Sequence, residues 1–461
     1  MHRLSTLCLC VFLLVLGVGV AGATSYYVDS VGGSDSNSGT APDQAWKTIA
    51  KVNTVNFAPG DNCYFKCGSD FTGTTTLVIG DDDDGTEASP ITFATYGTGA
   101  KPKFRNSSTG EWTNAIEMTN CVWVVLDGIY AYSTRYAGVR LTNADYCTVK
   151  NCEVYDTGMG IELTTTEYTL ITQNYCHNMG PVVNTPGGDD DYGGVGIWLY
   201  SGENEVSYNT VKDCRYDSYD YGYDGGCVEY YSMGTLNNCY IHHNWGEGNE
   251  GFWEVGGVDS STCYNHTFAY NVSYDYGYFN CMHLSGTFGL DIDNVKVEHN
   301  TVVRTSALWN VVGFDGAPDA NTYKLKNNVF HVTGTGNGAI FDGYSGFTHD
   351  YNCFYPYGGD TVGISLNSHE IQADPQFVDY NNKNYHLQST SPCRNAGTDL
   401  GYTVDFEGNP VPSGSAPDMG AYEYQEGPSA PVANFSGTPT SGTVPLTVNF
   451  TDTSSGTPTS W

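Results

Sequence analysis

The chain has few basic residues. Lys and Arg total 18 among 461 residues, against 51 Asp and Glu, which gives a formal net charge of −33. Nucleic acid binding depends on cationic contacts to phosphate, so this balance excludes a nucleic acid partner. The balance also argues against unaided capture of a polyanionic glycan. An acidic surface keeps an exported protein soluble, and solvation is the simplest explanation of the charge.

Long apolar runs are absent after the first 23 residues, so no transmembrane segment is predicted. Residues 1–23 have the pattern of a secretory signal, with His2 and Arg3 before an apolar run and small residues at 21–23. We therefore expect a secreted, extracellular or cell-surface protein. Two of the fifteen cysteines lie in the signal, so thirteen remain, and the sequence leaves their pairing open.

No helical stripe of apolar residues interrupts the chain, which instead repeats one short pattern. An asparagine recurs every 23 to 35 residues, each time after a short alternating run. The asparagines in this setting are Asn151, Asn174, Asn209, Asn244, Asn271, Asn300, Asn328 and Asn352. Such a period indicates stacked coils, and the Val, Ile, Thr and Tyr content with period-2 alternation indicates strands. We predict an all-β, right-handed parallel β-helix in which these asparagines stack at one bend.

Both ends of the coil region resemble secreted proteins of the pectate-lyase-like β-helix superfamily. The opening resemblance is carried by YYVD, GSDSNSGT and WKTIA, at residues 26–29, 33–40 and 46–50. The closing resemblance is carried by DPQF, SPCRNAG and PDMGAYEY, at residues 374–377, 391–397 and 417–424. It implies an N-terminal cap with the first coil in residues 24–105, and the β-helix with its closing segment in residues 106–425. A cap is also needed physically, because an open stack exposes a sheet edge.

The C-terminal tail has a different composition. Residues 426–431 have the character of a linker, and residues 432–461 resemble the opening of a PKD domain through VANFS and PLTVNFTD. That resemblance implies a truncated, incomplete immunoglobulin-like β-sandwich and an association with the cell surface. A β-helix joined to a PKD-like module also resembles exported glycan-degrading proteins of methanogenic archaea, including disaggregatase-type enzymes.

One strand of each coil is predicted to display a chemically unusual column. Each of seven segments that follow the bends has two apolar residues bracketing a third residue of variable character. Alternation places the bracketing residues in the core and the third residue outside. The outward column reads Glu117, Arg140, Glu162, Trp198, Glu229, Glu254 and His283.

An outward strand position normally holds a small polar residue, whereas this column holds four carboxylates. Glu229 beside Glu254 places like charges on neighbouring strands, which destabilises a sheet. Such a local conflict indicates function more often than accident. A charged, solvated face is the alternative interpretation.

Two coils carry inserts just before this column, and both inserts are rich in Tyr and Asp. The first contains Asp189, Asp190 and Asp191, and the second contains Tyr223 and Asp224. Long loops on a rigid stack would wall one face and form a carbohydrate groove, with flexible surface decoration as the alternative. The three consecutive aspartates are candidate ligands for Ca²⁺, as is the acidic run at residues 81–84.

We predict that Glu229 and Glu254 form the catalytic pair, with Asp224 as a third carboxylate and His283 orienting groups or carrying a proton. Neighbouring coils lie about 4.8 Å apart, near the separation of about 5 Å between the two carboxyl groups of a retaining glycosidase. Proximity also raises one pKa, which leaves that group protonated as the general acid.

The remaining members of the column are predicted to hold the substrate. Trp198 is expected to stack on a sugar ring, and Arg140 with Glu162 to hold hydroxyl groups or a substrate carboxylate. Tyr223 and Glu117 complete the predicted substrate-binding set.

Three functions stay open at this point. The first is a secreted glycoside hydrolase acting on an extracellular or cell-surface polysaccharide. The second is a Ca²⁺-assisted polysaccharide lyase on a uronate-containing glycan, with Arg140 and His283 as proton-abstracting groups, although the column holds no Lys and only one Arg. The third is a non-catalytic surface protein or adhesin. We expect a monomer that requires no cofactor for hydrolysis, with calcium as the one candidate metal.

Overall fold

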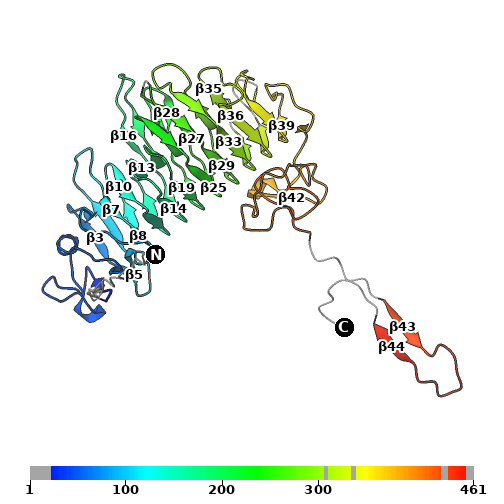
Figure 1. Ribbon diagram of the computed structural model, residues 1–461, viewed down its shortest axis with the longest axis horizontal. Helices are drawn as coiled ribbons and strands as arrows, with labels where there is room; N and C mark the ends of the chain where they lie inside the picture. The colour runs from blue at the N-terminus through cyan, green and yellow to red at the C-terminus, as the bar shows by residue number, and fades with distance from the viewer. Residues whose placement is uncertain (1–21, 259, 306–309, 334–338, 427–433, 453–461) are drawn as a thin grey trace, which may run out of the picture.

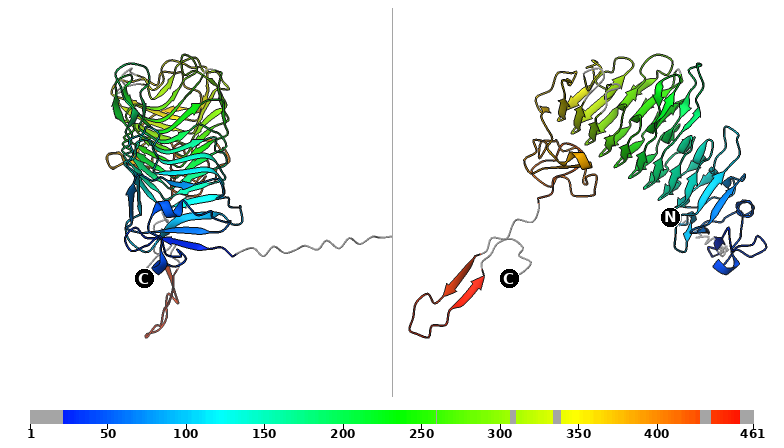
Figure 2. Two further views of the ribbon diagram at one scale, coloured as in Figure 1. Left: turned by 90° about the vertical axis from the view of Figure 1, so that its left-hand side faces the viewer. Right: turned by 180° about the vertical axis from the view of Figure 1, so that it is seen from behind.

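The computed structural model describes residues 22–258, 260–305, 310–333, 339–426 and 434–452. Nearly all of the predicted secretory signal, most of the predicted linker and both ends of the PKD-like tail lie outside these residues. The described chain is almost entirely β-structure. Three long parallel sheets, here named sheets A, B and C, wind along one axis from the blue N-terminal end to the yellow strands (Figures 1 and 2).

Sheets A and B each contain twelve strands, and each turn of the chain contributes one strand to each sheet. Sheet A consists of β1 (Ser25–Val28), β2 (Asn62–Lys66), β5 (Ile91–Tyr96), β8 (Val124–Asp127), β11 (Thr148–Lys150), β14 (Leu170–Thr172), β19 (Glu205–Ser207), β25 (Tyr240–His242), β29 (Thr267–Ala269), β33 (Val295–Glu298), β36 (Tyr323–Lys326) and β38 (Thr348–Asp350). Sheet B consists of β3 (Asp70–Gly73), β6 (Lys103–Asn106), β9 (Tyr130–Tyr132), β12 (Glu153–Tyr155), β15 (Tyr175–His177), β20 (Thr210–Lys212), β26 (Trp245–Glu247), β30 (Val272–Tyr274), β34 (Thr301–Arg304), β37 (Val329–Thr333), β39 (Cys353–Tyr357) and β40 (Ile371–Gln372).

Sheet C has nine strands and carries the predicted column. Its strands are β4 (Leu77–Ile79), β7 (Ile116–Val122), β10 (Ala137–Asp145), β13 (Met159–Thr164), β18 (Val195–Leu199), β23 (Gly226–Ser232), β27 (Gly251–Gly257), β31 (Tyr278–Met282) and β35 (Val312–Phe314). A small sheet of β24 (Thr235–Asn237), β28 (Thr262–Tyr264) and β32 (Asp291–Asp293) lies between sheets C and A along the chain. The predicted parallel β-helix is therefore confirmed.

The core is built by residues at the same level of successive coils. In sheet A the inward residues Val149, Ile171, Val206 and Ile241 pair in register and are each fully buried. Their neighbours on either side point outward, which is the period-2 alternation of a half-buried strand. β-branched residues suit these short strands because their side chains pack well on a pleated surface.

The asparagine ladder is present at the bend between sheets A and B. Each side-chain amide donates to the Oδ1 atom of the asparagine on the next coil at 2.9–3.1 Å, through Asn174, Asn209, Asn244, Asn271, Asn300, Asn328 and Asn352. The ladder asparagines are buried, so their amides satisfy backbone groups that no water reaches.

Asn151 is the exception to this prediction, because it lies one position before the ladder. Its φ of 52° is left-handed, and its amide donates to Asp127. Cys152 occupies the ladder position, and its backbone N–H donates to Asn174 Oδ1 at 2.9 Å. Asparagine tolerates the left-handed conformation better than most residues, which explains how it fits the neighbouring site.

Left-handed residues precede the ladder on later coils as well, and their rings lie in contact from one coil to the next. The centroids of Tyr208, His243, Tyr270 and His299 follow one another at 4.7, 5.4 and 4.6 Å. The His243 Nε2–H group donates to the Asp405 carbonyl oxygen, in the closing segment, at 2.9 Å.

A second, shorter ladder follows sheet B. The backbone N–H and the side-chain amide of Asn249 both donate to Asp275 Oδ1, at 3.0 and 2.8 Å. Asp275 Oδ2 accepts from Ser273 Oγ at 2.8 Å. Burial raises the pKa of Asp275 to about 7 and outweighs these hydrogen bonds, which lower it.

The N-terminal region joins the stack directly. β1 pairs with β2 in parallel, so the coils begin within residues 24–105. The short helices η1 (Pro42–Gln44) and α1 (Ile49–Val52) follow β1, and Thr48 caps α1 by accepting from the Lys51 N–H at 3.1 Å. Within the described residues, no helix has the length and apolarity to cross a membrane.

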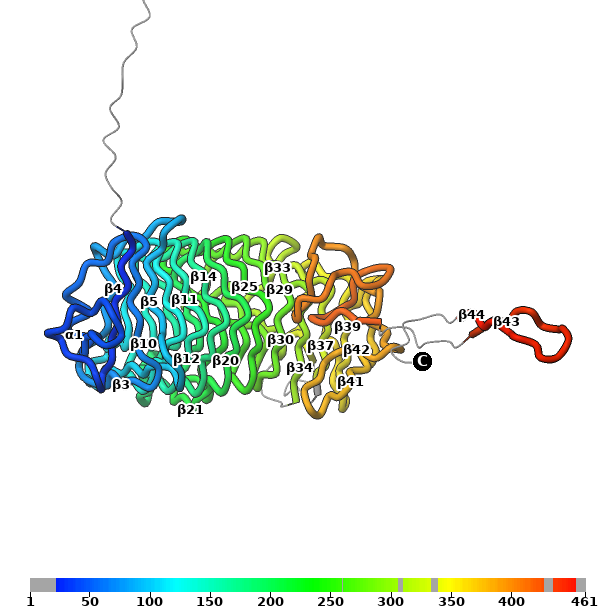
Figure 3. The backbone as a smooth tube through the Cα atoms, turned by 90° about the horizontal axis from the view of Figure 1, so that it is seen from below, coloured from blue at the N-terminus to red at the C-terminus, as the bar shows by residue number. Residues whose placement is uncertain are grey.

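The closing segment folds back along the last coils (Figure 3). It contains β41 (Phe377–Asp379), η2 (Tyr380–Asn382) and β42 (Asn384–Leu387), and its buried side chains pack on Val272, Val303 and Val329. The tail contributes one described antiparallel hairpin, β43 (Phe435–Thr438) with β44 (Asn449–Asp452), which lies beyond the coils. The PKD-like assignment of this tail stays a prediction.

Candidate active site

The predicted register of the outward column is confirmed along sheet C. Glu117, Arg140, Glu162, Trp198, Glu229 and Glu254 follow one another as paired residues of neighbouring parallel strands. Glu229 of β23 and Glu254 of β27 therefore lie side by side, with a strand spacing of about 4.8 Å.

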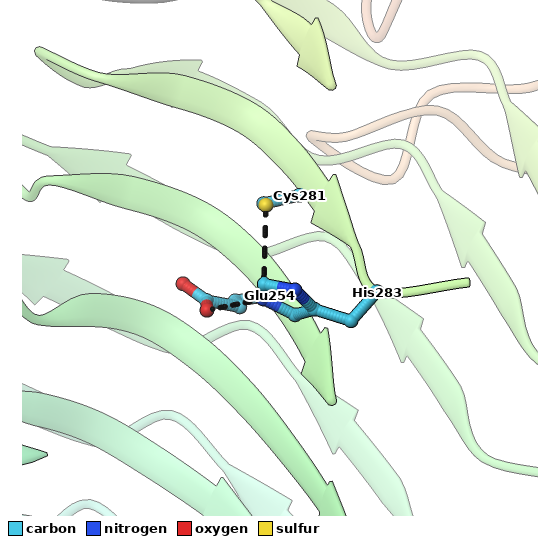
Figure 4. A group of neighbouring side chains, drawn as sticks. All are labelled: Glu254, Cys281 and His283. Atoms are coloured by element: carbon cyan, nitrogen blue, oxygen red, sulfur yellow. Dashed lines mark hydrogen bonds and ion pairs between the residues drawn. The ribbon is translucent and has the colours of Figure 1, made fainter. Parts of the chain in front are cut away.

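The placement of His283 in the column was wrong. Cys281 is the residue paired with Glu254, and His283 lies two residues further along, just beyond the end of β31. A slip of two residues preserves the alternation of faces, so His283 still reaches Glu254. Its Nε2 atom lies 3.0 Å from Glu254 Oε1 (Figure 4).

The two inserts form one wall beside this column. Each is an antiparallel hairpin: β16 (Pro181–Val183) with β17 (Tyr192–Gly193), and β21 (Tyr216–Ser218) with β22 (Gly222–Asp224). Asp191 of the first hairpin joins them, because its Oδ2 atom accepts from Ser218 Oγ, the Tyr219 N–H and the Asp220 N–H. These contacts order both inserts against each other.

A pocket of about 1000 Å³ lies between this wall and sheet C. Its lining brings together the predicted catalytic residues Asp224, Glu229, Glu254 and His283. Tyr223 and Trp198, from the predicted substrate-binding set, line it as well.

Three members of the predicted substrate-binding set are not among the described residues that line the pocket: Glu117, Arg140 and Glu162. Glu162 is only 1 % exposed, which corrects the prediction that it faces a ligand. Its Oε1 atom lies 3.5 Å from Arg140 Nε and accepts from Thr164 Oγ1 at 2.9 Å. Glu117 accepts from the Asn114 side-chain amide at 2.7 Å. Their predicted contacts with substrate gain no support from this arrangement.

Trp198 is also more enclosed than the outward column predicts, at 5 % exposure. Tyr200 stacks on its ring with centroids 5.5 Å apart, so the face expected to receive a sugar is covered. Among the described aromatic residues that line the pocket, Trp112 is the most exposed, with 58 % of its surface accessible against 38 % for Tyr223 and 37 % for Tyr221. It lies just before strand β7 of sheet C, outside the alternating strand segments from which the column was predicted.

Glu254 is held as a carboxylate by two donors. His283 Nε2 donates to Oε1 at 3.0 Å, and the Tyr278 hydroxyl donates to Oε2. Burial acts to raise the pKa of Glu254, but the hydrogen bond and charge of His283 and the hydrogen bond of Tyr278 outweigh it, so the pKa is lowered. His283 also donates from Nδ1 to Asp315 Oδ2 at 3.1 Å, and two carboxylate acceptors require both ring nitrogens to carry protons.

The charge of His283 follows from the same contacts. Burial alone would lower its pKa, but the contacts with Cys281 and Glu254 raise the pKa of His283 to about 12. The ring is therefore an imidazolium over the neutral pH range, and it fixes the ionised form of Glu254.

Glu229 has the opposite environment. Burial raises its pKa, and the nearby charges of Glu254 and Asp224 raise it further. Within the described chain, no hydrogen-bond donor stabilises the ionised form of Glu229. Burial also raises the pKa of Asp224 to about 7, although the Tyr216 hydroxyl donates to it at 2.6 Å. The neighbouring carboxyl groups therefore differ in protonation, as an acid and a base must.

Sequence reasoning missed four participants in this site: Tyr278, Cys281, Asp315 and Glu250. The register of β27 and β31 would have identified Cys281, but alternation cannot distinguish it from His283. Glu250 Oε2 accepts from Arg215 Nε at 2.6 Å, and the Arg215 guanidinium lies 3.4 Å from the ring centre of Tyr223. Arg215 thereby links Tyr223 to the pocket floor.

The predicted calcium ligands are only partly brought together. Asp190 and Asp191 have oxygen atoms within 4.8 Å of Asp220, whereas Asp189 is outside this group. Both oxygens of Asp191 already accept hydrogen bonds, from the Thr185 N–H and from the second hairpin. Calcium binding here stays a prediction.

Known proteins share the architecture of this chain. Residues 114–221 match the family described as right handed beta helix region. The crystal structure of pectate lyase Pel9A superposes with a TM-score of 0.55 at 15 % identity, covering 87 % of this chain and 97 % of that one. A rhamnogalacturonan lyase superposes with a TM-score of 0.51 at 15 % identity, covering 80 % and 96 %. The fold is a right-handed parallel β-helix.

One curated relative is similar in sequence over a short stretch. The lacto-N-biosidase of Bifidobacterium longum subsp. longum is 35 % identical over 89 residues, which is 19 % of this chain. The chain spans about 5 % of the length of that relative.

Proposed function

We propose that this protein is a secreted glycoside hydrolase that cleaves a neutral extracellular or cell-surface polysaccharide in the pocket over sheet C. The observation that carries the proposal is the pairing of Glu229 with Glu254 on neighbouring strands at the floor of that pocket. Paired carboxylates that differ in protonation are the machinery of glycosidic bond hydrolysis.

The contacts of the two carboxyl groups assign their roles. Glu254 accepts from His283 and Tyr278, so it is the ionised nucleophile. Glu229 lacks such donors among the described residues and is the acid/base that protonates the leaving oxygen. Their strand spacing of about 4.8 Å favours the retaining mechanism, in which the carboxyl groups lie about 5–5.5 Å apart.

The charge of the pocket selects the class of glycan. Among the described residues that line it, eleven are Asp or Glu and none is Lys or Arg. The one cationic ring in the described lining, His283, is already paired with Glu254 and Asp315. A polyanionic uronate chain would therefore meet repulsion there, and a lyase needs a free cation to neutralise the substrate carboxylate. A neutral glycan avoids both problems. Trp112 offers an exposed ring at the edge of the pocket for a sugar face.

The names of similar proteins support a carbohydrate-active enzyme. The relative of higher identity is a lacto-N-biosidase, whereas the two lyases share the fold at 15 % identity. The PKD-like tail supports attachment to a cell surface, and disaggregatase-type activity on a cell-wall glycan is consistent with that location. These assignments belong to the proposal.

The decisive experiment measures reducing ends released from a panel of neutral and uronate-containing polysaccharides, with and without a chelator. Glu229→Gln and Glu254→Gln should each lower turnover by about 10²-fold or more. Glu153→Gln, on the outer face of sheet B, is the matched control and should retain turnover. An unsaturated product that absorbs in the ultraviolet would establish a lyase instead. Glycan binding without turnover on every substrate would establish a non-catalytic surface protein.

A further inference from the structure

Three different metal-ligating atoms converge at the floor of the pocket. A carboxylate oxygen of Glu254, Cys281 Sγ and an imidazole nitrogen of His283 all lie within 4.8 Å of one another. The imidazole is between the other two, 3.0 Å from the carboxylate oxygen and 3.9 Å from the sulfur (Figure 4). All three side chains come from the neighbouring strands β27 and β31 or the residue just after β31.

These separations match a tetrahedral metal site. With a Zn–S bond of about 2.3 Å and Zn–N or Zn–O bonds of about 2.0–2.1 Å, tetrahedral donor atoms lie about 3.3–3.6 Å apart. The observed distances of 3.0 and 3.9 Å bracket that range. Side-chain adjustments of a few tenths of an ångström would bring these two pairs of atoms to that separation.

The surroundings support the same interpretation. Asp315 Oδ2 accepts from His283 Nδ1 at 3.1 Å, which fixes Nε2 toward the pocket in the way that a carboxylate orients a metal-bound histidine. Gly313 pairs with Cys281 on the next strand, so the position beside Cys281 carries no side chain. Glu254, Cys281 and His283 all line the pocket, so an ion held by them would have room for a water molecule as its fourth ligand.

We propose that Glu254, Cys281 and His283 bind one Zn²⁺ ion, and that the ion inhibits the enzyme by occupying the Glu254 carboxylate. The mixed sulfur, nitrogen and oxygen ligands suit zinc and exclude calcium, which takes oxygen ligands. Binding releases one proton from the Cys281 thiol and one from His283 Nε2 to solvent. The binding stands on this geometry alone, whereas the inhibition rests on the proposed function.

Direct binding tests the site without any activity assay. Co²⁺ titrated into the full-length protein should give one equivalent of binding with a sulfur-to-cobalt charge-transfer band, and Zn²⁺ should displace it. Cys281→Ser should abolish the band. Cys67→Ser is the matched control, because Cys67 and Cys281 are the two cysteines among those described that are not fully buried. Asp315→Asn should weaken Zn²⁺ binding by about 10–100-fold.

The outcomes separate the two parts of the proposal. A band that persists in Cys281→Ser, or its absence from the wild-type protein, overturns the site, and melting curves confirm that each variant is folded. Asp220→Asn excludes the acidic cluster of the wall as the source of binding if one equivalent of Co²⁺ still binds with unchanged affinity. Zn²⁺ bound at this site without loss of glycan hydrolysis overturns the inhibition. A protein that binds Zn²⁺ and hydrolyses no glycan refutes the proposed function while the metal site stands.

Discussion

Asn249 donates two hydrogen bonds to a single oxygen of Asp275, and both side chains are buried. The carboxyl group occupies a position where an asparagine could accept the same two hydrogen bonds. Its pKa is raised by burial to about 7, so the group folds in its neutral form and charges at a cost.

We therefore predict that Asp275→Asn stabilises the protein in a pH-dependent way. The folded pKa of about 7 lies above the ordinary value of 3.8, so the contribution of the wild-type carboxyl is complete below that ordinary value and is lost as pH rises through about 7. The variant should match the wild type at low pH and gain up to about 4 kcal/mol in unfolding free energy above pH 7. Thermal melts between acidic and alkaline pH measure this. A constant difference at every pH would contradict it.

The ladder asparagines should be far more important for stability than Asn151. Asn300 donates to Phe268 O and Asn328 Oδ1 and accepts from Asn271, all within the buried stack. Asn300→Ala leaves several of these groups unsatisfied, at a cost of about 1–3 kcal/mol for each. Asn151→Ala loses one exposed hydrogen bond and should cost about 1–2 kcal/mol, mainly through its left-handed backbone. Equal losses in denaturant unfolding would show that the ladder is dispensable.

Activity should be confined to the end of the column that faces the pocket. Glu117→Gln keeps the oxygen that accepts from Asn114, and Glu117 is outside the described pocket lining. We expect its kcat/KM to remain within about twofold of the wild type, in contrast with the loss of about 10²-fold or more in Glu229→Gln. A large rise in KM for Glu117→Gln would extend the substrate site along sheet C.

Sugar stacking should depend on Trp112. Its ring is 58 % exposed at the pocket, whereas the ring of Trp198 is covered by Tyr200. Trp112→Ala should raise KM about threefold to tenfold with little change in kcat, because an aromatic contact contributes about 0.5–1.5 kcal/mol. Trp198→Phe preserves the packing and should leave KM unchanged. The reverse pattern would return the stacking role to Trp198.

The sequence pattern was sufficient to predict the fold and the pairing of Glu229 with Glu254. Period and alternation specify which residues share a level of the stack, and this placed Glu229 beside Glu254 correctly. Alternation alone cannot separate positions two residues apart, so His283 was placed where Cys281 lies. Asn151 was placed in the ladder because asparagine suits both the ladder and the left-handed position before it.

The burial of Glu162 and Trp198 could not be predicted for a different reason. Both side chains point outward, as alternation requires, but other segments of the protein surround them. Val182 and Tyr192 of the first hairpin pack around Trp198, and Arg140 and Thr164 contact Glu162. The direction in which an insert folds depends on contacts between segments far apart in sequence. The pattern within a single strand carries no information about those contacts.

The link between the two inserts has a consequence for altering specificity. Asp191 belongs to one hairpin, and the three groups that donate to its Oδ2 atom belong to the other. Shortening either hairpin by itself would leave the partner without the contacts that shape it, so the two hairpins form one structural unit. Grafting both hairpins together onto another coil stack of this kind would transfer the contour of the glycan site, while exchanging only one would not.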